Sequence, residues 1–284
     1  MVPKLDLQTH MYSSSETKRW VKVNGQEVTK RSELTRLMTF RIEETLRLTI
    51  LSKEKKERVI ELLPISYHTL WRLMSEDDIR ARRRKVEKQS NGLLGYLNIE
   101  EMTTEHLRKF EKEVYSRSFG KEGLVIDVRN NPGGFIADKL LSILCHPNHA
   151  TTIPRGGKKS YPLTYLPKVI WTKKIIVLCN QNSTSNAEIF SHSIKTLKRG
   201  KLVGVTTGGK VISMPKVKIL NAGTLSVPDR GWWPNGTGID MEDSGAIPDY
   251  TVWPKPGDPA KGIDRQLDKA IEVLTQEIEA EKIK

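Results

Sequence analysis

The sequence lacks several features that mark whole classes of protein. It contains only two cysteines, Cys145 and Cys179, and neither has the spacing of a metal-ligand cluster or of a disulfide framework. No run of about 18 apolar residues occurs, so a membrane-spanning helix is not predicted. The first residues also lack the basic-then-apolar order of a secretory signal. We therefore expect a cytoplasmic protein with reduced thiols, without a cofactor and without a metal.

The positive charge is the strongest bias in composition. The formal net charge is +13, and residues 80–88, "RARRRKVEK", concentrate part of it. Basic patches bind nucleic acid or acidic surfaces. This run has no aromatic residue on which a base could stack, and acidic residues flank it in "MSEDDIR". We therefore favour a solvated helical connector over a nucleic-acid site.

Composition and hydrophobic patterning divide the chain into four regions. Residues 1–17 are polar and aperiodic, which predicts a loose N-terminus. Residues 18–65 read as a small α+β module, with short strands around an Asn24–Gly25 turn, a helix from about Ser32 and two further strands. Residues 66–90 are charged and helical without a clear apolar face, as in a linker. Residues 91–284 form the fourth region.

The fourth region alternates strands that are apolar from end to end with helices. Such strands are typical of a parallel sheet covered by helices on both faces, which predicts an α/β fold. The expected strands are 93–99, 123–128, 173–179 and 201–205, and the expected helices are 103–118, 135–144, 187–199 and one from residue 264 onward. Extended segments are expected up to residue 228.

Polar residues interrupt this pattern at the ends of two predicted strands. The first interruption, "IDVRNNPGGF", places Gly133 and Gly134 just before a helix. Glycines there allow backbone amides to face a cavity and hold an anion, although a tight packing turn explains them equally well. The second, "NQNSTSNAEIF", places Ser183, Thr184 and Ser185 at the start of another helix. A helix cap accounts for one of these hydroxyls, and a nucleophile is the alternative reading.

A hydroxyl nucleophile needs a base that accepts its proton. The six histidines are residues 10, 68, 106, 146, 149 and 192. His192 lies seven positions after Ser185, a rise of roughly 10 Å along a helix, and is expected to pack or face solvent. Lys210, between glycines and β-branched residues, is a candidate base if burial lowers its pKa, and an exposed turn lysine otherwise. Trp232 and Trp233 either line a specificity pocket or pack a loop, and we favour packing.

Six motifs in order resemble the tail-specific, or C-terminal processing, serine peptidases, and most closely the catalytic core of the tricorn proteases. They are "GYLNI", "GLVIDVRNNPGG", "STSNAEIFSH", "KLVGVTTGGKVI", "GTGIDMEDSGAIPDY" and "GIDRQLDKAI". The likeness extends from about residue 18 to residue 274. It implies a crotonase/ClpP-like core of repeated ββα units, preceded by a PDZ-like module, and cleavage of peptides through an acyl-enzyme.

The resemblance also implies roles for individual residues. Ser185, three positions before the glutamate of "SNAE", matches the family nucleophile. The backbone amides of Gly134 and Asn186 match the oxyanion hole. Lys210 of "TGGK" matches the lysine base of the tail-specific branch, whereas the tricorn branch uses a histidine from an upstream helical domain. Glu242 resembles the glutamate that assists that histidine.

The sequence departs from this pattern in its first part. The module at 18–65 matches only the later part of a PDZ domain, and no counterpart of the histidine-bearing helical domain is found. Our first hypothesis is a serine endopeptidase that acts on peptide or unfolded protein segments. The second is a catalytically inactive peptide-binding protein that lacks the upstream base. A homo-oligomer, or a partner that supplies the missing N-terminal elements, is compatible with both.

Overall fold

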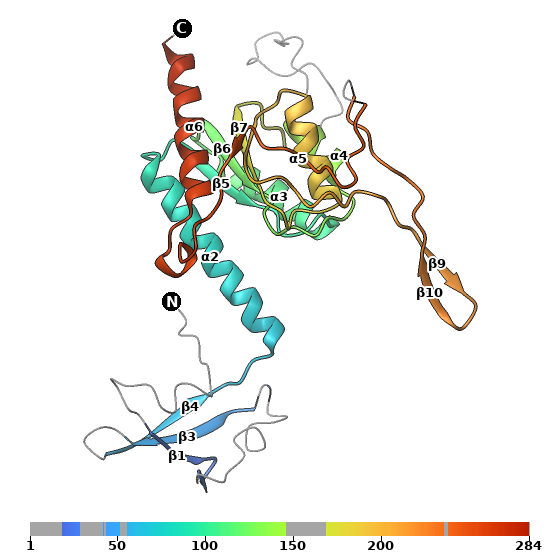
Figure 1. The fold of residues 1–284 in the computed structure, drawn as a ribbon. Coiled ribbons are helices and arrows are strands. Elements are labelled where there is room, and N and C mark those ends of the chain that lie inside the picture. Colours follow the sequence, from blue (N-terminus) through green and yellow to red (C-terminus); the bar gives the residue numbers. More distant parts are fainter. Residues whose placement is uncertain are drawn as a thin grey trace, which may run out of the picture. The chain divides into compact units, whose positions relative to one another are not determined.

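The computed structural model describes residues 19–28, 42, 44–51, 56–145, 169–235 and 238–283. The chain forms two compact units, Met1–Arg80 and Ala81–Lys284 (Figure 1). The boundary falls inside helix α2 (Tyr67–Gln89), where the sequence predicts a helical segment. The loose N-terminus predicted at residues 1–17 and the helix predicted from Ser32 lie outside the described residues.

The first unit contains an antiparallel sheet in the order β2-β1-β3-β4. Its strands are β1 (Arg19–Val23), β2 (Gln26–Glu27), β3 (Leu46–Leu51) and β4 (Glu57–Leu62). Asn24 and Gly25 both have positive φ, at 48° and 82°, as a two-residue hairpin turn requires. Val23, Leu46 and Leu48 form its small core. The turn and strands predicted here are confirmed.

The second unit is built on a parallel sheet of five strands in the order β11-β8-β7-β6-β5. The strands are β5 (Leu94–Asn98), β6 (Gly123–Asp127), β7 (Lys174–Cys179), β8 (Lys201–Gly204) and β11 (Tyr250–Thr251). β6 is buried along its whole length, because helices cover both faces of the sheet. The predicted α/β fold with a parallel sheet is confirmed. Its C-terminal edge gathers the loops that follow β5, β6 and β7.

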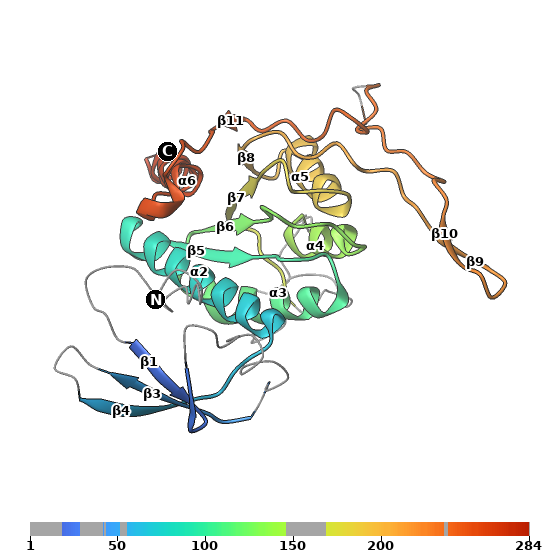
Figure 2. The same cartoon turned by 60° about the horizontal axis from the view of Figure 1, so that its bottom comes forward.

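Helices cover the two faces of this sheet (Figure 2). They are α3 (Thr104–Arg117), α4 (Ala137–Leu144), α5 (Asn186–Thr196) and α6 (Arg265–Lys282). Helix α6 packs on β6, β7 and β8, while α3 packs on β5 and α5 packs on β7 and β8 from the opposite face. Two of these helices are capped by side chains, since Thr103 accepts from the His106 N–H and Asp264 accepts from the Leu267 N–H.

The basic run in α2 packs against acidic residues of the second unit. Arg83 contacts Glu113 at 2.5 Å and Lys85 contacts Asp268 at 2.6 Å. Arg82 lies 3.9 Å from Asp264 at the start of α6. These ion pairs occupy much of the positive charge that sequence alone left available for nucleic acid.

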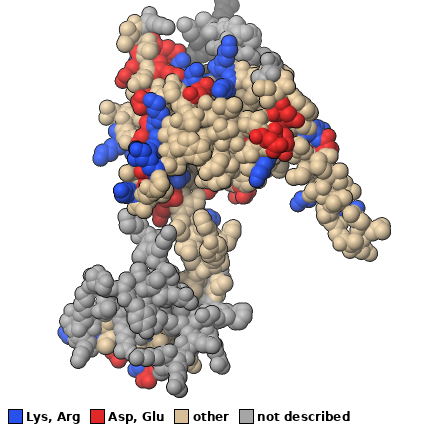
Figure 3. Space-filling view, viewed as in Figure 1, with Lys and Arg blue, Asp and Glu red and all other residues tan. Residues whose placement is uncertain are grey.

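The extended segments expected before residue 228 form a hairpin. Strands β9 (Lys216–Ile219) and β10 (Gly223–Ser226) pair with each other alone, and every residue from 214 to 230 is exposed. The hairpin reaches away from the sheet as a thin arm whose surface is mostly uncharged (Figure 3). Sequence alone did not separate this arm from the core.

Both cysteines are free. Cys179 is buried, and burial raises the pKa of its thiol to about 12, as expected of an inert core thiol. Cys145 is partly exposed at the end of α4. In the described part of the chain, no helix has the length and apolarity to cross a bilayer. The same residues contain no cluster of three or more His, Cys, Asp or Glu that would hold a metal.

Candidate active site

Ser185 lies between β7 and α5 in a strained backbone conformation, and we call this position the serine corner. Its backbone has φ 55° and ψ −124°, outside the regions that serine normally adopts. Such a conformation costs about 1–3 kcal/mol and persists only where neighbours fix it. Ser185 is half-buried and lies at the positive end of the helix dipole of α5.

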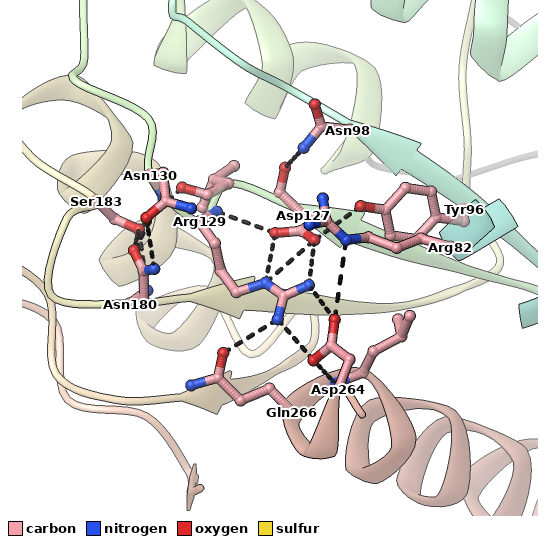
Figure 4. Close-up of polar contacts among 12 residues, drawn as sticks. Arg82, Tyr96, Asn98, Asp127, Arg129, Asn130, Asn180, Ser183, Asp264 and Gln266 are labelled. Carbon is pink, nitrogen blue, oxygen red and sulfur yellow. Dashed lines mark hydrogen bonds and ion pairs between the residues drawn. The ribbon is translucent and has the colours of Figure 1, made fainter. Parts of the chain in front are cut away.

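The polar residues before Ser185 hold two loops together. The Ser183 hydroxyl donates to the Val128 carbonyl at 2.8 Å. Asn180 and Asn130 bond reciprocally: the Asn130 N–H donates to Asn180 Oδ1, and Asn180 Nδ2 donates to Asn130 Oδ1, both at 2.9 Å (Figure 4). The asparagine-rich stretch therefore joins the loops that follow β6 and β7 by hydrogen bonds. Ser185 comes directly after this stretch, at the start of α5.

The glycine loop after β6 lies directly against this corner. A Cβ atom on Gly133 would fall 2.6 Å from Ser185 Cβ and 2.9 Å from the Asn186 nitrogen, and φ is +95°. The Gly133 N–H donates to Asn131 Oδ1 at 2.8 Å, and Asn131 Nδ2 donates to the Ile99 carbonyl at 2.7 Å. Close approach therefore requires glycine, and Asn131 fixes the loop in place.

Two backbone N–H groups remain unused beside Ser185. Among the described residues, no hydrogen bond uses the N–H of Gly134 or that of Asn186. The Gly134 nitrogen follows Gly133 directly, and Gly133 touches Asn186, so both donors lie at the mouth of α5. Unpaired amides at a helix N-terminus can hold an anion or a developing oxyanion. The pairing expected from the sequence is thus compatible with the observed loop positions.

The side chain of Asn186 has a structural role that sequence reasoning missed. Its Oδ1 accepts from the Ala137 N–H at 2.8 Å, at the first residue of α4. This bond ties the segment after Gly134 to the start of α5. No sequence signal identified it, because the partner lies 49 positions away.

Glu188 joins the serine corner to residues 207–210. It is fully buried, and its carboxylate accepts four hydrogen bonds. Oε1 accepts from the N–H of Ser185 at 3.0 Å and of Lys210 at 2.8 Å. Oε2 accepts from the Thr207 hydroxyl and the Gly209 N–H, both at 2.6 Å. Sequence reasoning assigned no role to Glu188, although a serine with glutamate three positions later is the signature of a capping box.

Lys210 and Glu242 lie on the same side of Ser185. The Lys210 carbonyl accepts from the Ser185 N–H at 3.0 Å, but the Lys210 side chain is exposed. No described residue hydrogen-bonds to its amino group. Glu242 Oε2 accepts from the N–H groups of Val211 and Ile212, at 2.7 and 2.9 Å. Glu242 thus supports the backbone after Lys210, while the described residues leave the Lys210 side chain exposed.

No described histidine hydrogen-bonds to Ser185. His192 lies on α5, with Nε2 3.1 Å from the Thr196 hydroxyl, and burial together with Lys195 lowers its pKa. His106 Nδ1 lies 2.7 Å from the Thr103 hydroxyl in the first turn of α3. The other histidines are His68, which is exposed, and residues 10, 146 and 149, which lie outside the described part of the chain.

A buried ion network anchors the loop that carries the glycines (Figure 4). Arg129 contacts Asp127 at 2.7 Å and Asp264, the N-cap of α6, at 2.8 Å, and the Tyr96 hydroxyl donates to Asp127 at 2.8 Å. Burial alone would lower the pKa of Arg129, but the two carboxylates raise it well above its usual range. Burial would raise the pKa of Asp264, but hydrogen bonds from Arg129 and its charge lower it.

Comparisons with known proteins find relatives of this chain in sequence and in fold. A model of peptidase family S41 matches residues 93–252. The chain is 30% identical over 260 residues to tricorn protease from Thermoplasma acidophilum. This alignment covers 90% of the chain and 23% of that protein. It is 32% identical over 217 residues to tricorn protease homolog 1 from Streptomyces coelicolor, covering 76% of this chain and 19% of that protein.

The same relationship is seen in structure. The crystal structure of the tricorn protease superimposes with a TM-score of 0.73 at 29% identity, covering 93% of this chain and 25% of that one. The chain thus spans about a quarter of the length of the relatives it matches. A model of type II secretion system protein B also matches residues 2–52, a much smaller share of the chain.

Proposed function

This chain belongs to peptidase family S41, and we propose that it hydrolyses peptide bonds through an acyl-enzyme formed on Ser185. The observation that carries the proposal is the pair of unused N–H groups, on Gly134 and Asn186, at the corner where Ser185 lies. A serine needs such donors, because negative charge develops on the carbonyl oxygen that it attacks. Removal of one donor costs about 100- to 1,000-fold in related chemistry.

The proposed reaction has two halves. Ser185 Oγ bonds to the carbonyl carbon while its proton passes to a base, and the oxyanion is held by the two amides. Collapse of this intermediate breaks the C–N bond, and the leaving amine takes the proton. Water then attacks the ester and restores the serine. Within this chain we assign the base to Lys210, which must be neutral when it acts, and assign Glu242 the task of holding the Lys210 segment.

We propose finer features of the fold by resemblance. The five-stranded sheet and its helices would correspond to a crotonase/ClpP-like core of ββα units, spanning residues 91–284. The four-stranded sheet at 18–65 would correspond to the later part of a PDZ domain, joined through a helical linker at 66–90. The antiparallel pairing of β1, β3 and β4 supports that assignment.

A second candidate function is a peptide-binding core that is inactive alone. The exposed side chain of Lys210 favours it, because the described residues do not surround the amine with the apolar groups that a lysine base requires. A histidine supplied by another polypeptide would then act as base. In this case Ser185 and both amides are in place, and hydrolysis requires a second polypeptide.

Labelling with a fluorophosphonate probe distinguishes these functions. The wild-type chain, Ser185→Ala and Lys210→Ala are incubated with the probe, and hydrolysis of denatured casein is measured in parallel. The proposed peptidase labels and cleaves, and Ser185→Ala abolishes both. Labelling that survives Ser185→Ala would refute the assignment of the nucleophile. Absence of labelling in a folded wild-type chain would support the inactive core.

We propose peptides and unfolded protein segments as substrates, and the cytoplasm as the location. The ion pairs of Arg82, Arg83 and Lys85 do not favour nucleic acid as a partner. A homo-oligomer, or a partner chain that supplies N-terminal elements, fits the short span of this chain against its relatives.

A further inference from the structure

A groove of about 290 Å³ runs along α5, beginning one turn from Ser185. We name it the α5 groove. Helix α5 supplies one wall, and the loop carrying Trp232 and Trp233 supplies the other. Its lining comprises Asp138, Ile189, His192, Ser193, Thr196, Leu197, Trp232, Trp233, Pro234, Asn235 and Met241.

The groove lies on the face of α5 that begins at Ser185, because Ile189, His192 and Thr196 follow Ser185 at helical spacing. Ile189 lies one helical turn from Ser185, and its N–H donates to the Ser185 carbonyl at 3.1 Å. Asp138 follows Ala137, whose N–H is held by the Asn186 side chain at 2.8 Å. The groove therefore starts about one helical turn from Ser185 and extends away from it along α5.

The tryptophan wall is fixed by specific contacts. Trp232 Nε1 donates to the Ser213 hydroxyl at 3.4 Å, and the Trp232 carbonyl accepts from the Met241 N–H at 3.0 Å. A Cβ atom on Gly231 would lie 2.7 Å from the Trp233 ring, so glycine allows that ring to lie against the backbone. Trp233 is nevertheless 59% exposed, and a ring held in position yet open to solvent offers a contact surface. Packing of the loop thus accounts for Trp232 and not for Trp233.

The chemistry of the lining favours an apolar occupant. Six of the eleven lining residues are apolar: Ile189, Leu197, Trp232, Trp233, Pro234 and Met241. Burial and Lys195 lower the pKa of His192, which disfavours the charged form of its ring. Among the lining residues that the structure describes, Asp138 is the only carboxylate, and no lysine or arginine is present. The volume lies at the lower end of the range of about 300–1,000 Å³ typical of ligand pockets, and suits one large side chain.

We propose that the α5 groove binds the side chain of the substrate residue on the acyl side of the scissile bond, and selects aromatic or large aliphatic residues. The inference rests on the proposed function. Trp233 stacks on the bound side chain, Ile189 forms the near wall, and Asp138 at the rim disfavours acidic residues.

Binding to the Ser185→Ala variant tests this selection without catalysis. Fluorescent peptides that differ at one position, carrying Phe, Leu, Ala, Lys or Asp, are titrated by anisotropy. Phe and Leu peptides are expected to bind roughly tenfold or more tightly than the Ala peptide. Adding Trp233→Ala should remove that preference, and adding Trp253→Ala should not, because Trp253 is 63% exposed and lies outside the groove.

Asp138→Asn supplies the second arm. The preference for Phe and Leu should survive this change, whereas a preference for Lys that Asp138→Asn removes would overturn the apolar assignment. Equal binding of all five peptides would also overturn it. Probe labelling of the wild-type chain is measured separately. Failure to label refutes the proposed hydrolysis and leaves the binding preference standing, so the two proposals fail by different results.

Discussion

The groups on the two sides of Ser185 are held in place to different degrees. On the oxyanion side, Gly133 is pressed against Ser185, and buried Asn131 holds the loop by hydrogen bonds at 2.8 and 2.7 Å. On the base side, Glu188 and Glu242 hold the backbone of residues 209–212, yet the Lys210 amino group is exposed. The chain therefore fixes the proposed oxyanion donors and leaves the proposed proton acceptor exposed.

The difference has a physical basis. Backbone amides are neutral, so they are fixed at little electrostatic cost by side-chain amides and by the helix dipole. A lysine base must lose its charge, which requires burial against an apolar surface. Such a surface must come from elsewhere if Lys210 is to act. The comparison predicts that changes on the oxyanion side damage both fold and reactivity, whereas changes at Lys210 affect reactivity alone.

The largest effect is expected for Gly133→Ala. The new methyl group would collide with Ser185 Cβ at 2.6 Å in a backbone conformation with φ +95°. We expect complete loss of fluorophosphonate labelling and destabilisation by about 3 kcal/mol, read from urea unfolding. Gly120→Ala is the matched control, because Gly120 also has positive φ but has open space around it. Equal labelling by both variants would mean that the loop does not shape the site.

Lys210→Ala is expected to lower the labelling rate about 1,000-fold without changing the urea midpoint. A general base contributes about 100- to 10,000-fold, and an exposed side chain contributes little to stability. Lys201→Ala, at another exposed lysine, is the control. If Lys210→Ala labels as fast as the wild type, the base is supplied by other residues or by a partner chain.

Glu188→Gln is expected to slow labelling about 100-fold and to lower the free energy of unfolding by about 3 kcal/mol. Glutamine offers one acceptor oxygen where the carboxylate serves four donors, so buried donors lose their partners. Glu105→Gln, in the exposed first turn of α3, should change neither quantity measurably. If Glu188→Gln changes neither the labelling rate nor the free energy of unfolding, Glu188 does not couple Ser185 to residues 207–210.

The sequence predicted some of these features and missed others. The strands, the helices and the glycine loop were predictable, because apolar runs, caps and paired glycines are local signals. Glu188 was missed although its spacing from Ser185 is local, since the other three donors come from residues 207–210. Exposure of Lys210 was one of two readings that the sequence left open, because burial depends on which distant segments pack against a side chain and the local pattern does not report that.

A smaller effect is expected for Asp264→Asn, which weakens the anchor behind the oxyanion loop. Loss of a charged hydrogen bond to Arg129 should lower stability by about 2 kcal/mol at pH 7. The pKa of Asp264 is lowered in the folded state, so its contribution is present above about pH 4 and is lost as pH falls through the folded value. In urea unfolding at pH 7, 5, 4 and 3, the free energy of unfolding should therefore fall less with decreasing pH in the variant than in the wild type. Parallel pH curves for the two proteins would contradict this.

The smallest effect is expected from shortening the arm that follows the base side. Ser213 pairs with Arg230, so replacing residues 215–228 by Asn-Gly leaves a two-residue turn in register. Every residue from 214 to 230 is exposed, and an isolated pair of strands adds little to stability in water. We expect a change below about 0.5 kcal/mol and an unchanged labelling rate. A tenfold loss of labelling would show that the hairpin helps to position the backbone of residues 209–212. The hydrogen bonds of Glu242 would then not be sufficient to hold that segment.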